Sequence, residues 1–373
     1  MNQSRLRFPL MALAMAAMLA ALWAGLVRLG WRWPALQPAL AMSHGAIMVS
    51  GFLGTLIAIE RAVALRERWA YTGPVLSGVG ALLLILGVGG PAGPLLMTLG
   101  SLWLVVVYIV IVRRHSSNYT LLMGAGAVAL LVGNILWLTG WPVFRLVLWW
   151  QAFLILTIAG ERLELGRIVR LSENAQVVFL AAVGVYLAGI TTSLVSLSSG
   201  MRLAGLGMLS LAIWLLRYDI ARRTIFKEGL PRFAAICLLS GYAWLGAAGV
   251  MGLTFGEVLG GVRYDAFLHA VFLGFVFSMI FGHAPIIFPA IFGVEVRFHR
   301  AFYFHLIVLH LSLILRVAGD LMSSPSARLW GGLLNGVAIL VFIGMNLFSV
   351  LISRRASLGE ISTARQSIGA AQE

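Results

Sequence analysis

The sequence predicts an all-α protein that crosses a membrane many times. Hydrophobic residues make up 61% of its 373 residues and charged residues only 11%, so a water-soluble globule would lack polar side chains for its surface. About 20 consecutive apolar residues cross the roughly 30 Å hydrocarbon core of a bilayer. Twelve segments meet that requirement and leave little chain for a soluble domain; they cover residues 10–29, 37–59, 72–90, 93–112, 119–139, 143–160, 175–197, 201–216, 233–254, 264–288, 301–319 and 329–353.

Basic residues set the expected orientation of these spans. Most of the 27 Lys and Arg residues lie in the N-terminal segment, the even-numbered loops and the C-terminal tail. Because cytoplasmic loops carry the excess of basic residues, we expect both termini in the cytoplasm and a place in a bacterial inner membrane. The charges are spread over short loops, which excludes a nucleic-acid footprint. The apolar run after Arg5 and Arg7 is interpreted as a retained helix, since cleaving it as a signal peptide would reverse the charge pattern.

We expect a single twelve-helix transmembrane domain over residues 1–356, surrounded by the lipid bilayer. The polar composition of residues 357–373 is typical of a disordered tail. Cys237 is the only cysteine, so disulfide bonds, thiolate zinc sites and iron–sulfur clusters are excluded within one chain. A bound metal would therefore need nitrogen ligands.

Two of the spans resemble each other. The second contains "SHGAIMVSGFLGTLI" and the tenth "LHAVFLGFVFSMI", each with a His, then Gly-Phe, then Thr or Ser. The second and sixth spans also both end in Glu-Arg, at Glu60-Arg61 and Glu161-Arg162. Spans two, six and ten are spaced by four, which predicts a pseudo-threefold arrangement of four-helix units.

Ionisable residues inside a membrane usually face the interior of the helix bundle, which makes histidines the candidate ligands. At 1.5 Å per residue, His44 and His269 lie at matched depths, roughly 10 Å below the outer surface, and we expect them to converge on one ligand. The candidates lie within the second, tenth and eleventh spans; they are His44, His269, His283, His305 and His310.

A second, deeper pair is expected from the same depth argument. His283 lies about 21 Å deeper than His269, so the two cannot share one metal ion. His305 is its predicted companion, with His310 near the midplane of the bilayer. His305 and His310 point about 140° apart on one helix, so at most one of them faces a given centre. Pro285 and Pro289 are expected to kink or break the tenth span after His283.

Asp265 precedes His269 by one helical turn. It could orient that imidazole through the second ring nitrogen, or it could pair with Arg263 at the interface, and both interpretations stay open.

Two imidazoles at one depth suit a b-type haem, whose iron takes axial ligands from facing helices. Copper held by imidazoles is the second candidate, and histidines that only hydrogen-bond across helices are the third. Glycines near the histidines would admit a flat ring or simply allow close helix packing; they are Gly45, Gly51, Gly54 and Gly274.

The sequence resembles the NnrS family, twelve-helix membrane proteins described as containing haem and copper and connected with nitric oxide metabolism. It resembles subunit I of the haem–copper oxidases more distantly. The segments that carry the likeness are "SHGAIMVSGFLGTLIAIERAV", "AGERLELGRIV" and "LHAVFLGFVFSMIFGHAP". The resemblance implies that His44, His269 and His283 bind haem or metal. The chain departs from the pattern after His283, where Thr-Gly is missing, and it has no His-His pair, so an oxygen-reducing copper site lacks ligands.

The expected function is therefore haem or copper binding in nitric oxide or respiratory redox metabolism. Whether the protein turns over a substrate is left open. Because the sequence shows no soluble cytochrome or flavin domain, electron transfer would need a partner protein. The alternative is a twelve-helix secondary transporter of a small solute, since internal repeats and proline-interrupted helices are also common transporter features.

Overall fold

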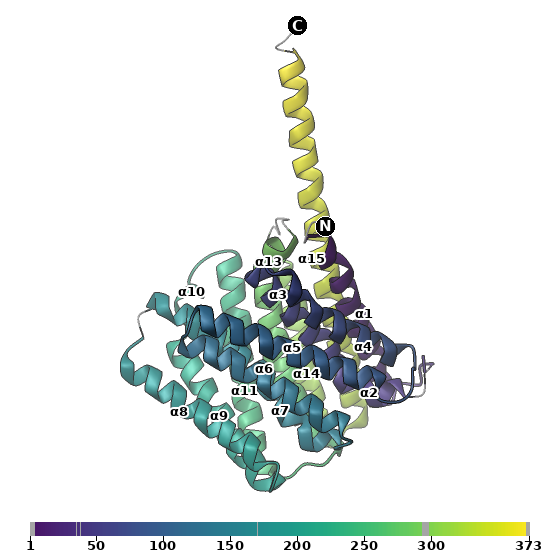
Figure 1. Ribbon diagram of the computed structural model, residues 1–373, viewed down its shortest axis with the longest axis vertical. Coiled ribbons are helices and arrows are strands. Elements are labelled where there is room, and N and C mark those ends of the chain that lie inside the picture. Colours follow the sequence, from purple (N-terminus) through teal and green to yellow (C-terminus); the bar gives the residue numbers. More distant parts are fainter. Residues whose placement is uncertain (1–3, 35, 38, 170, 293–297, 371–373) are drawn as a thin grey trace.

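The computed structural model describes residues 4–34, 36–37, 39–169, 171–292 and 298–370 (Figure 1). Its elements are α1 (Ser4–Leu29), α2 (Leu40–Ala46), η1 (Ile47–Gly54), α3 (Thr55–Leu65), η2 (Arg68–Tyr71), α4 (Thr72–Ile85), α5 (Ala92–Arg114), α6 (Asn118–Leu138), α7 (Val143–Leu165), η3 (Gly166–Val169), α8 (Glu173–Thr192), α9 (Leu197–Tyr218), α10 (Ala221–Thr224), α11 (Leu230–Phe255), α12 (Gly261–His269), η4 (Ala270–Phe277), α13 (Ser278–Phe292), α14 (Phe302–Leu321) and α15 (Pro325–Ala370). The described residues contain helices and no strands, which confirms the all-α fold class.

Eleven helical segments of the described chain are long and apolar enough to cross a membrane. The span that is missing is the third of the twelve expected, residues 72–90, which is helical in α4 for only 14 residues. It ends early because Gly87 adopts a φ of +74° and the amides of Gly87 and Val88 bond back to the carbonyls of Leu84 and Leu83. This pattern is a Schellman motif, which terminates helices at glycine.

Three spans form the interior of the bundle, and we call them the inner spans. They are Leu40–Leu65 (α2, η1 and α3), α7, and Gly261–Ile286 (α12, η4 and most of α13). Within the most apolar 18 residues of each span, 78% are buried in α7 and 72% in each of the other two, against at most 56% elsewhere. These are the second, sixth and tenth expected spans, as a threefold arrangement of four-helix units requires.

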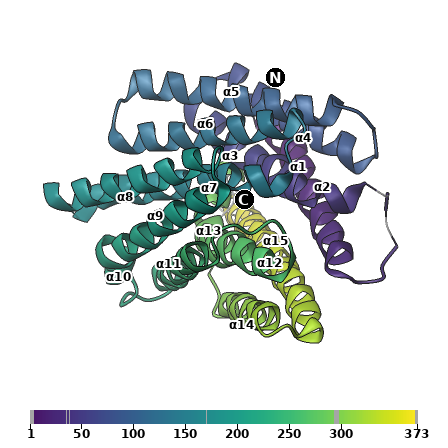
Figure 2. The same ribbon diagram turned by 90° about the horizontal axis from the view of Figure 1, so that it is seen from below.

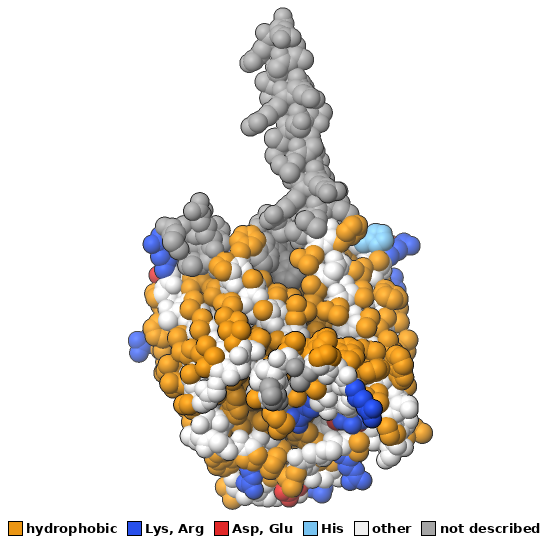
Figure 3. Space-filling view, turned by 90° about the vertical axis from the view of Figure 1, so that its right-hand side faces the viewer, with side chains coloured by type: hydrophobic (Ala, Val, Ile, Leu, Met, Phe, Trp, Pro, Cys, Tyr) orange, Lys and Arg blue, Asp and Glu red, His pale blue; other side chains and the backbone are white. Residues whose placement is uncertain are grey.

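The remaining helices surround the inner spans (Figure 2). Neighbours in sequence pack side by side, as in α4 with α5, α8 with α9, and α14 with α15. A contact between α15 and α1 joins the last helix to the first. Figure 3 shows that hydrophobic side chains cover most of one face, with basic side chains mostly toward its two ends, as expected for a surface in contact with lipid.

The two ends of the chain lie on the same side of the bundle (Figure 1). The backbone of α15 continues beyond the bundle as far as Ala370. Side chains after Ser349 lie outside the described part of the structure, so the disorder expected for residues 357–373 stays a prediction.

Two of the inner spans change helix type at the same place. Both η1 and η4 are π-helical segments of 8 residues, and each begins four residues before a Gly-Phe pair, at Gly51 and at Gly274. Each is followed by an α-helix that starts with a hydroxyl residue, Thr55 or Ser278. The repeat seen in the sequence is thus also a repeat of backbone conformation. π-Helical turns are rare and frequently mark functional sites.

The prolines of the tenth span do not break it. α13 continues past Pro285 and Pro289 to Phe292, which corrects the expected break after His283. Membrane helices tolerate proline because neighbouring groups satisfy the freed carbonyls. The irregular part of this span, η4, instead lies between His269 and His283.

Candidate functional site

A large cavity lies at the end of the bundle opposite the chain termini, and we call it the histidine cavity. It has a volume of about 960 Å³ and is lined by all three inner spans together with α1, α14 and α15. The end of α1 after Leu22 and the beginning of α15 after Arg328 line it, which places it far from both ends of the chain. His44 and His269 are both part of its wall.

The two histidines are held in the same way. The Nδ1 atom of His44 lies 2.7 Å from the carbonyl oxygen of Ala21, and Nδ1 of His269 lies 2.9 Å from that of Asp265. A carbonyl only accepts hydrogen bonds, so both Nδ1 atoms carry the proton and both Nε2 atoms keep a lone pair. No described residue bonds to either Nε2 atom. The structure therefore brings together two imidazoles whose free nitrogens can act as ligands.

Gly25 of α1 makes room for the ring of His44. A Cβ atom built at Gly25 would lie 2.8 Å from Cε1 of His44, closer than real Cβ contacts allow. Together with the carbonyl of Ala21, one turn earlier on α1, this glycine fixes where the imidazole lies.

Asp265 pairs with an arginine that the sequence did not suggest. Arg316 of α14 donates from Nε and Nη2 to the two carboxylate oxygens, at 2.8 and 2.9 Å. Nδ1 of His269 lies 3.3 Å from Oδ1 of the same carboxylate. Arg263, the expected partner, instead lies over the ring of Phe255. The expected pair with Arg263 is therefore wrong, because the ion pair is with Arg316, 51 residues away in sequence, and the role of Asp265 in orienting His269 stays a prediction.

The charged part of the cavity wall is mostly basic. Arg28, Arg316 and Arg328 line it together with Asp265. Arg328 lies 3.0 Å from Asp320, which is buried behind the wall, and 3.9 Å from Asp265. The cavity itself therefore presents three guanidinium groups and one carboxylate.

Aromatic side chains also line the cavity, and a buried amide fixes one of them. Trp150 of α7 lines the cavity, and its indole N–H donates to Oδ1 of Asn134 at 3.0 Å. Ser50 of η1 donates to the same oxygen at 2.7 Å, and Nδ2 of Asn134 donates to the carbonyl of Met97. An isolated polar residue in an apolar span was the only signal for this network.

His310 lies away from the cavity wall. The indole N–H of Trp244 donates to its Nδ1 at 3.0 Å, so its proton is on Nε2 and that nitrogen is not a free ligand. The ring of Trp244 covers Gly274, where an added Cβ would clash with the indole. Of the glycines expected to admit a flat ring, Gly274 is thus covered by an indole of the protein itself. Gly51 packs against Ala81 of α4.

The expected inner pair of His283 and His305 is not formed. His283 uses both ring nitrogens: Nδ1 lies 2.9 Å from the carbonyl of Met279 and Nε2 accepts from Arg162 at 3.3 Å. His305 is completely buried, and neither of its nitrogens has a partner among the described residues. Its ring is enclosed by aromatic rings; they belong to Phe233, Phe281, Phe302 and Phe342. Depth matching alone could not show that the two rings have different neighbours.

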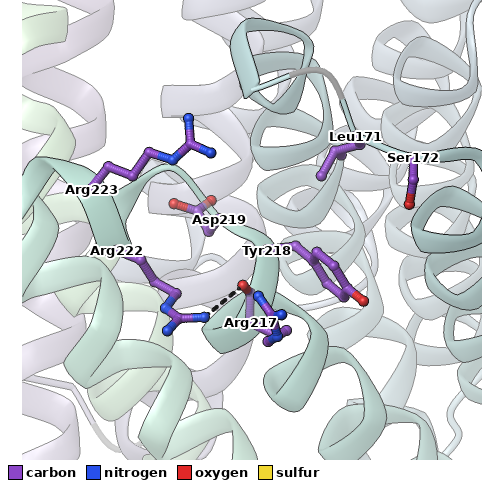
Figure 4. A pocket seen from close by; sticks show the side chains of 7 residues that line it. All are labelled: Leu171, Ser172, Arg217, Tyr218, Asp219, Arg222 and Arg223. Carbon is purple, nitrogen blue, oxygen red and sulfur yellow. Dashed lines mark hydrogen bonds between the residues drawn. The ribbon is translucent and has the colours of Figure 1, made fainter.

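A smaller cavity of about 400 Å³ lies near the start of α10 (Figure 4). Its arginines are exposed, and Arg222 donates to the backbone carbonyl of Arg217. Asp219 is already paired with Arg162 at 2.8 Å. The cavity lies at a loop rich in arginine, of the kind expected at the cytoplasmic surface of a membrane. It is lined by Leu171, Ser172, Arg217, Tyr218, Asp219, Arg222 and Arg223.

Comparisons with known proteins place the chain in a family. No curated protein and no solved structure matches it. One family model, described as "Domain of unknown function (DUF8744)", matches residues 7–351, which is nearly all of the membrane-spanning region. The chain therefore belongs to the DUF8744 family.

Proposed function

We propose that the protein binds a b-type haem in the histidine cavity, with His44 and His269 as axial ligands. The observation that supports this most is the shared geometry of the two imidazoles. They come from different inner spans, line one cavity, and each uses Nδ1 on a backbone carbonyl while Nε2 stays free. Histidines that ligate metals are usually oriented by such a bond at the other ring nitrogen.

The rest of the cavity fits a macrocycle that is apolar apart from its carboxylates. Its volume of about 960 Å³ is at the upper end of the roughly 300–1,000 Å³ typical of ligand pockets. Trp150, Phe272 and Phe277 supply aromatic wall, and Arg28 supplies positive charge for the carboxylates. A haem bound there would supply one-electron chemistry, and His44 and His269 would hold its iron.

Copper is the second candidate cofactor. Among the described residues, no three His, Cys, Asp or Glu side chains are grouped as metal ligands. Copper sites commonly take three such ligands, whereas a haem iron, held by four nitrogens of its own porphyrin, needs two. The ligand count therefore favours haem.

The process that this cofactor serves is proposed from the resemblance to the NnrS family. We infer a role in nitric oxide or respiratory redox metabolism at a bacterial inner membrane, with electrons exchanged through a partner protein. Two inner spans with His followed by Gly-Phe support this, because they are the segments that carry the resemblance.

Optical spectra of the purified protein test the proposal. The oxidised and reduced protein in detergent should show Soret and α bands, and metal analysis should give stoichiometric iron. His44→Ala and His269→Ala should each lose the haem or change its spin state. His310→Phe is the matched control, because that histidine also lies within a span but its Nδ1 is bonded to Trp244.

Several results would contradict the proposal. One is the absence of a Soret band and of stoichiometric iron or copper. Another is a spectrum that survives loss of both His44 and His269. Solute flux into proteoliposomes that persists in the double variant would instead support a transporter.

A further inference from the structure

A second group of charged residues lies at the other ends of the inner spans, away from the histidine cavity. It follows the internal repeat. Counting nine residues from Gly51, Ala152 and Gly274 leads to Glu60, Glu161 and His283 in the three inner spans. We call these residues, together with Arg61, Arg162 and Asp219, the Glu–Arg cluster.

Two carboxylates in this cluster share one guanidinium nitrogen. Nη2 of Arg61 lies 2.7 Å from Oε1 of Glu60 and 2.6 Å from Oε1 of Glu161. The side chains are mostly buried, with 13%, 29% and 24% of the surface of Arg61, Glu60 and Glu161 exposed. The two carboxylate oxygens are thus within about 5 Å of each other, a distance at which like charges in a poorly solvated site repel strongly.

The second arginine of the cluster does not relieve this repulsion. Arg162 donates to Asp219 from Nε at 2.8 Å, and both side chains are at least 97% buried. Its Nη1 donates to His283. No other basic side chain of the described residues bonds to Glu60 or Glu161. With Glu60, Glu161 and Asp219 all ionised, three acids of the cluster would face two arginines; Glu164 is exposed to solvent and lies outside this count.

An unused hydroxyl group lies beside the shared guanidinium. Tyr108 of α5 is 98% buried, because only 2% of its surface is exposed, and its hydroxyl has no partner among the described residues. It lies near enough to Arg61, Glu161 and Glu60 to interact with their charges. Nε of Arg61 is also buried without a partner. A buried hydroxyl without a partner indicates that a further hydrogen-bonding species belongs here.

We propose that the Glu–Arg cluster is a proton-binding site, in which Glu60 and Glu161 hold one proton between them next to Arg61. A single added proton neutralises one carboxyl and makes the charges of the cluster equal, two positive and two negative, when His283 stays neutral. It also gives one carboxyl an O–H that the hydroxyl of Tyr108 or a bridging water can accept. The groups that face the site are Glu60 and Arg61 of α3, Tyr108 of α5, Glu161, Arg162 and Glu164 of α7, Asp219 after α9, Tyr242 of α11 and His283 of α13.

A second carboxylate pair in the same molecule serves as an internal comparison. Arg316 bonds to Asp265, and Arg328 lies 3.0 Å from Asp320 and 3.9 Å from Asp265, so that two acids face two arginines. The formal charges there are equal in number, whereas those of the Glu–Arg cluster are not.

Infrared spectroscopy of the full chain in lipid, titrated with acid and base, tests this inference. At neutral pH the wild type should show the C=O stretch of a protonated carboxyl, which shifts in heavy water and disappears as the pH rises. Glu60→Gln and Glu161→Gln should each abolish this band, because the remaining carboxylate then pairs one-to-one with Arg61. Tyr108→Phe should shift its frequency without removing it.

Glu67→Gln is the matched control. Glu67 is also a glutamate paired with one arginine, Arg114, but at 3.0 Å and with both side chains exposed, so its removal should leave the band unchanged. Each glutamine variant keeps one carboxylate on Arg61, which is the charge state proposed for the protonated wild type, so the thermal unfolding temperature should not fall. If one of them fails to fold, the other still decides the question.

Three results would overturn the inference. They are a wild-type spectrum without the band, a band of equal size in both glutamine variants, and a band that is replaced by added sodium ions at constant pH. The measurement does not depend on any cofactor in the histidine cavity, because no residue of the Glu–Arg cluster lines that cavity.

Discussion

Arg316 donates two hydrogen bonds to the carboxylate of Asp265, at 2.8 and 2.9 Å. The pair joins α14 to α12 within one turn of His269. It lies where two helices far apart in sequence meet the wall of the histidine cavity. Several measurable consequences follow from this pair and from the contacts around it.

Replacing Asp265 should destabilise the protein strongly. In Asp265→Asn, Arg316 keeps its charge while only 9% of its side chain is exposed. Leaving one partner of a buried ion pair uncompensated costs about 3–5 kcal/mol, which thermal unfolding in detergent would detect. The exposed pair Glu67–Arg114 is the control, since Glu67→Gln should cost less than about 1 kcal/mol. Equal losses in the two variants would contradict the expected importance of Asp265.

Filling the space beside His44 should weaken ligand binding in the cavity. In Gly25→Ala the new Cβ would lie 2.8 Å from the imidazole, and the ring would have to move away from Ala21. Strain of about 1–3 kcal/mol corresponds to about 5- to 150-fold weaker haem binding, measured by titrating the protein with haem.

Gly336→Ala is the control for that substitution. Gly336 lines the same cavity, but its added Cβ would meet only Leu26, at 3.9 Å. Haem affinity should therefore be unchanged in Gly336→Ala. A similar loss in both variants would show that Gly25 has no particular relation to His44.

Removing the buried amide of Asn134 should loosen the aromatic wall. Asn134→Leu leaves the indole N–H of Trp150 and the hydroxyl of Ser50 without their acceptor. Each unpaired buried group costs about 1–3 kcal/mol, so the unfolding temperature should drop clearly. Thr139→Val, near the exposed end of the same helix, removes only bonds to backbone carbonyls and should change stability by less than about 0.5 kcal/mol.

Replacing His305 distinguishes a packing role from a ligand role. Both of its ring nitrogens are buried without partners among the described residues, and unsatisfied buried polar groups are costly. His305→Phe, which adds one more ring to an aromatic cluster, should therefore raise the unfolding temperature. A lower temperature together with loss of bound metal would instead restore His305 as a ligand.

The sequence was sufficient for the features that depend on composition and depth. Apolar length predicted eleven of the twelve expected spans, and the shared depth of His44 and His269 agrees with their place on one cavity. Their roles as ligands, like those of the other three histidines, stay predictions. The ion pair between Asp265 and Arg316 could not be predicted, because it depends on the rotation of α14 against α12. The lack of hydrogen-bond partners for His305 among the described residues could not be predicted for the same reason. The depth of a residue along a helix can be read from the sequence, but its neighbours around the helix axis cannot.

The π-helical segment η1 has a consequence for the two ends of its span. A π-turn contains one residue more than an α-turn, and each residue of an α-helix rotates the chain by about 100°. The direction in which Glu60 points is thus tied to the direction in which His44 points through an irregular stretch of backbone. Deleting a single residue there would restore regular winding and turn one end of the helix away from its partners. The extra residue of the π-turn therefore lets one continuous helix point the side chains at its two ends toward two separate sets of neighbours.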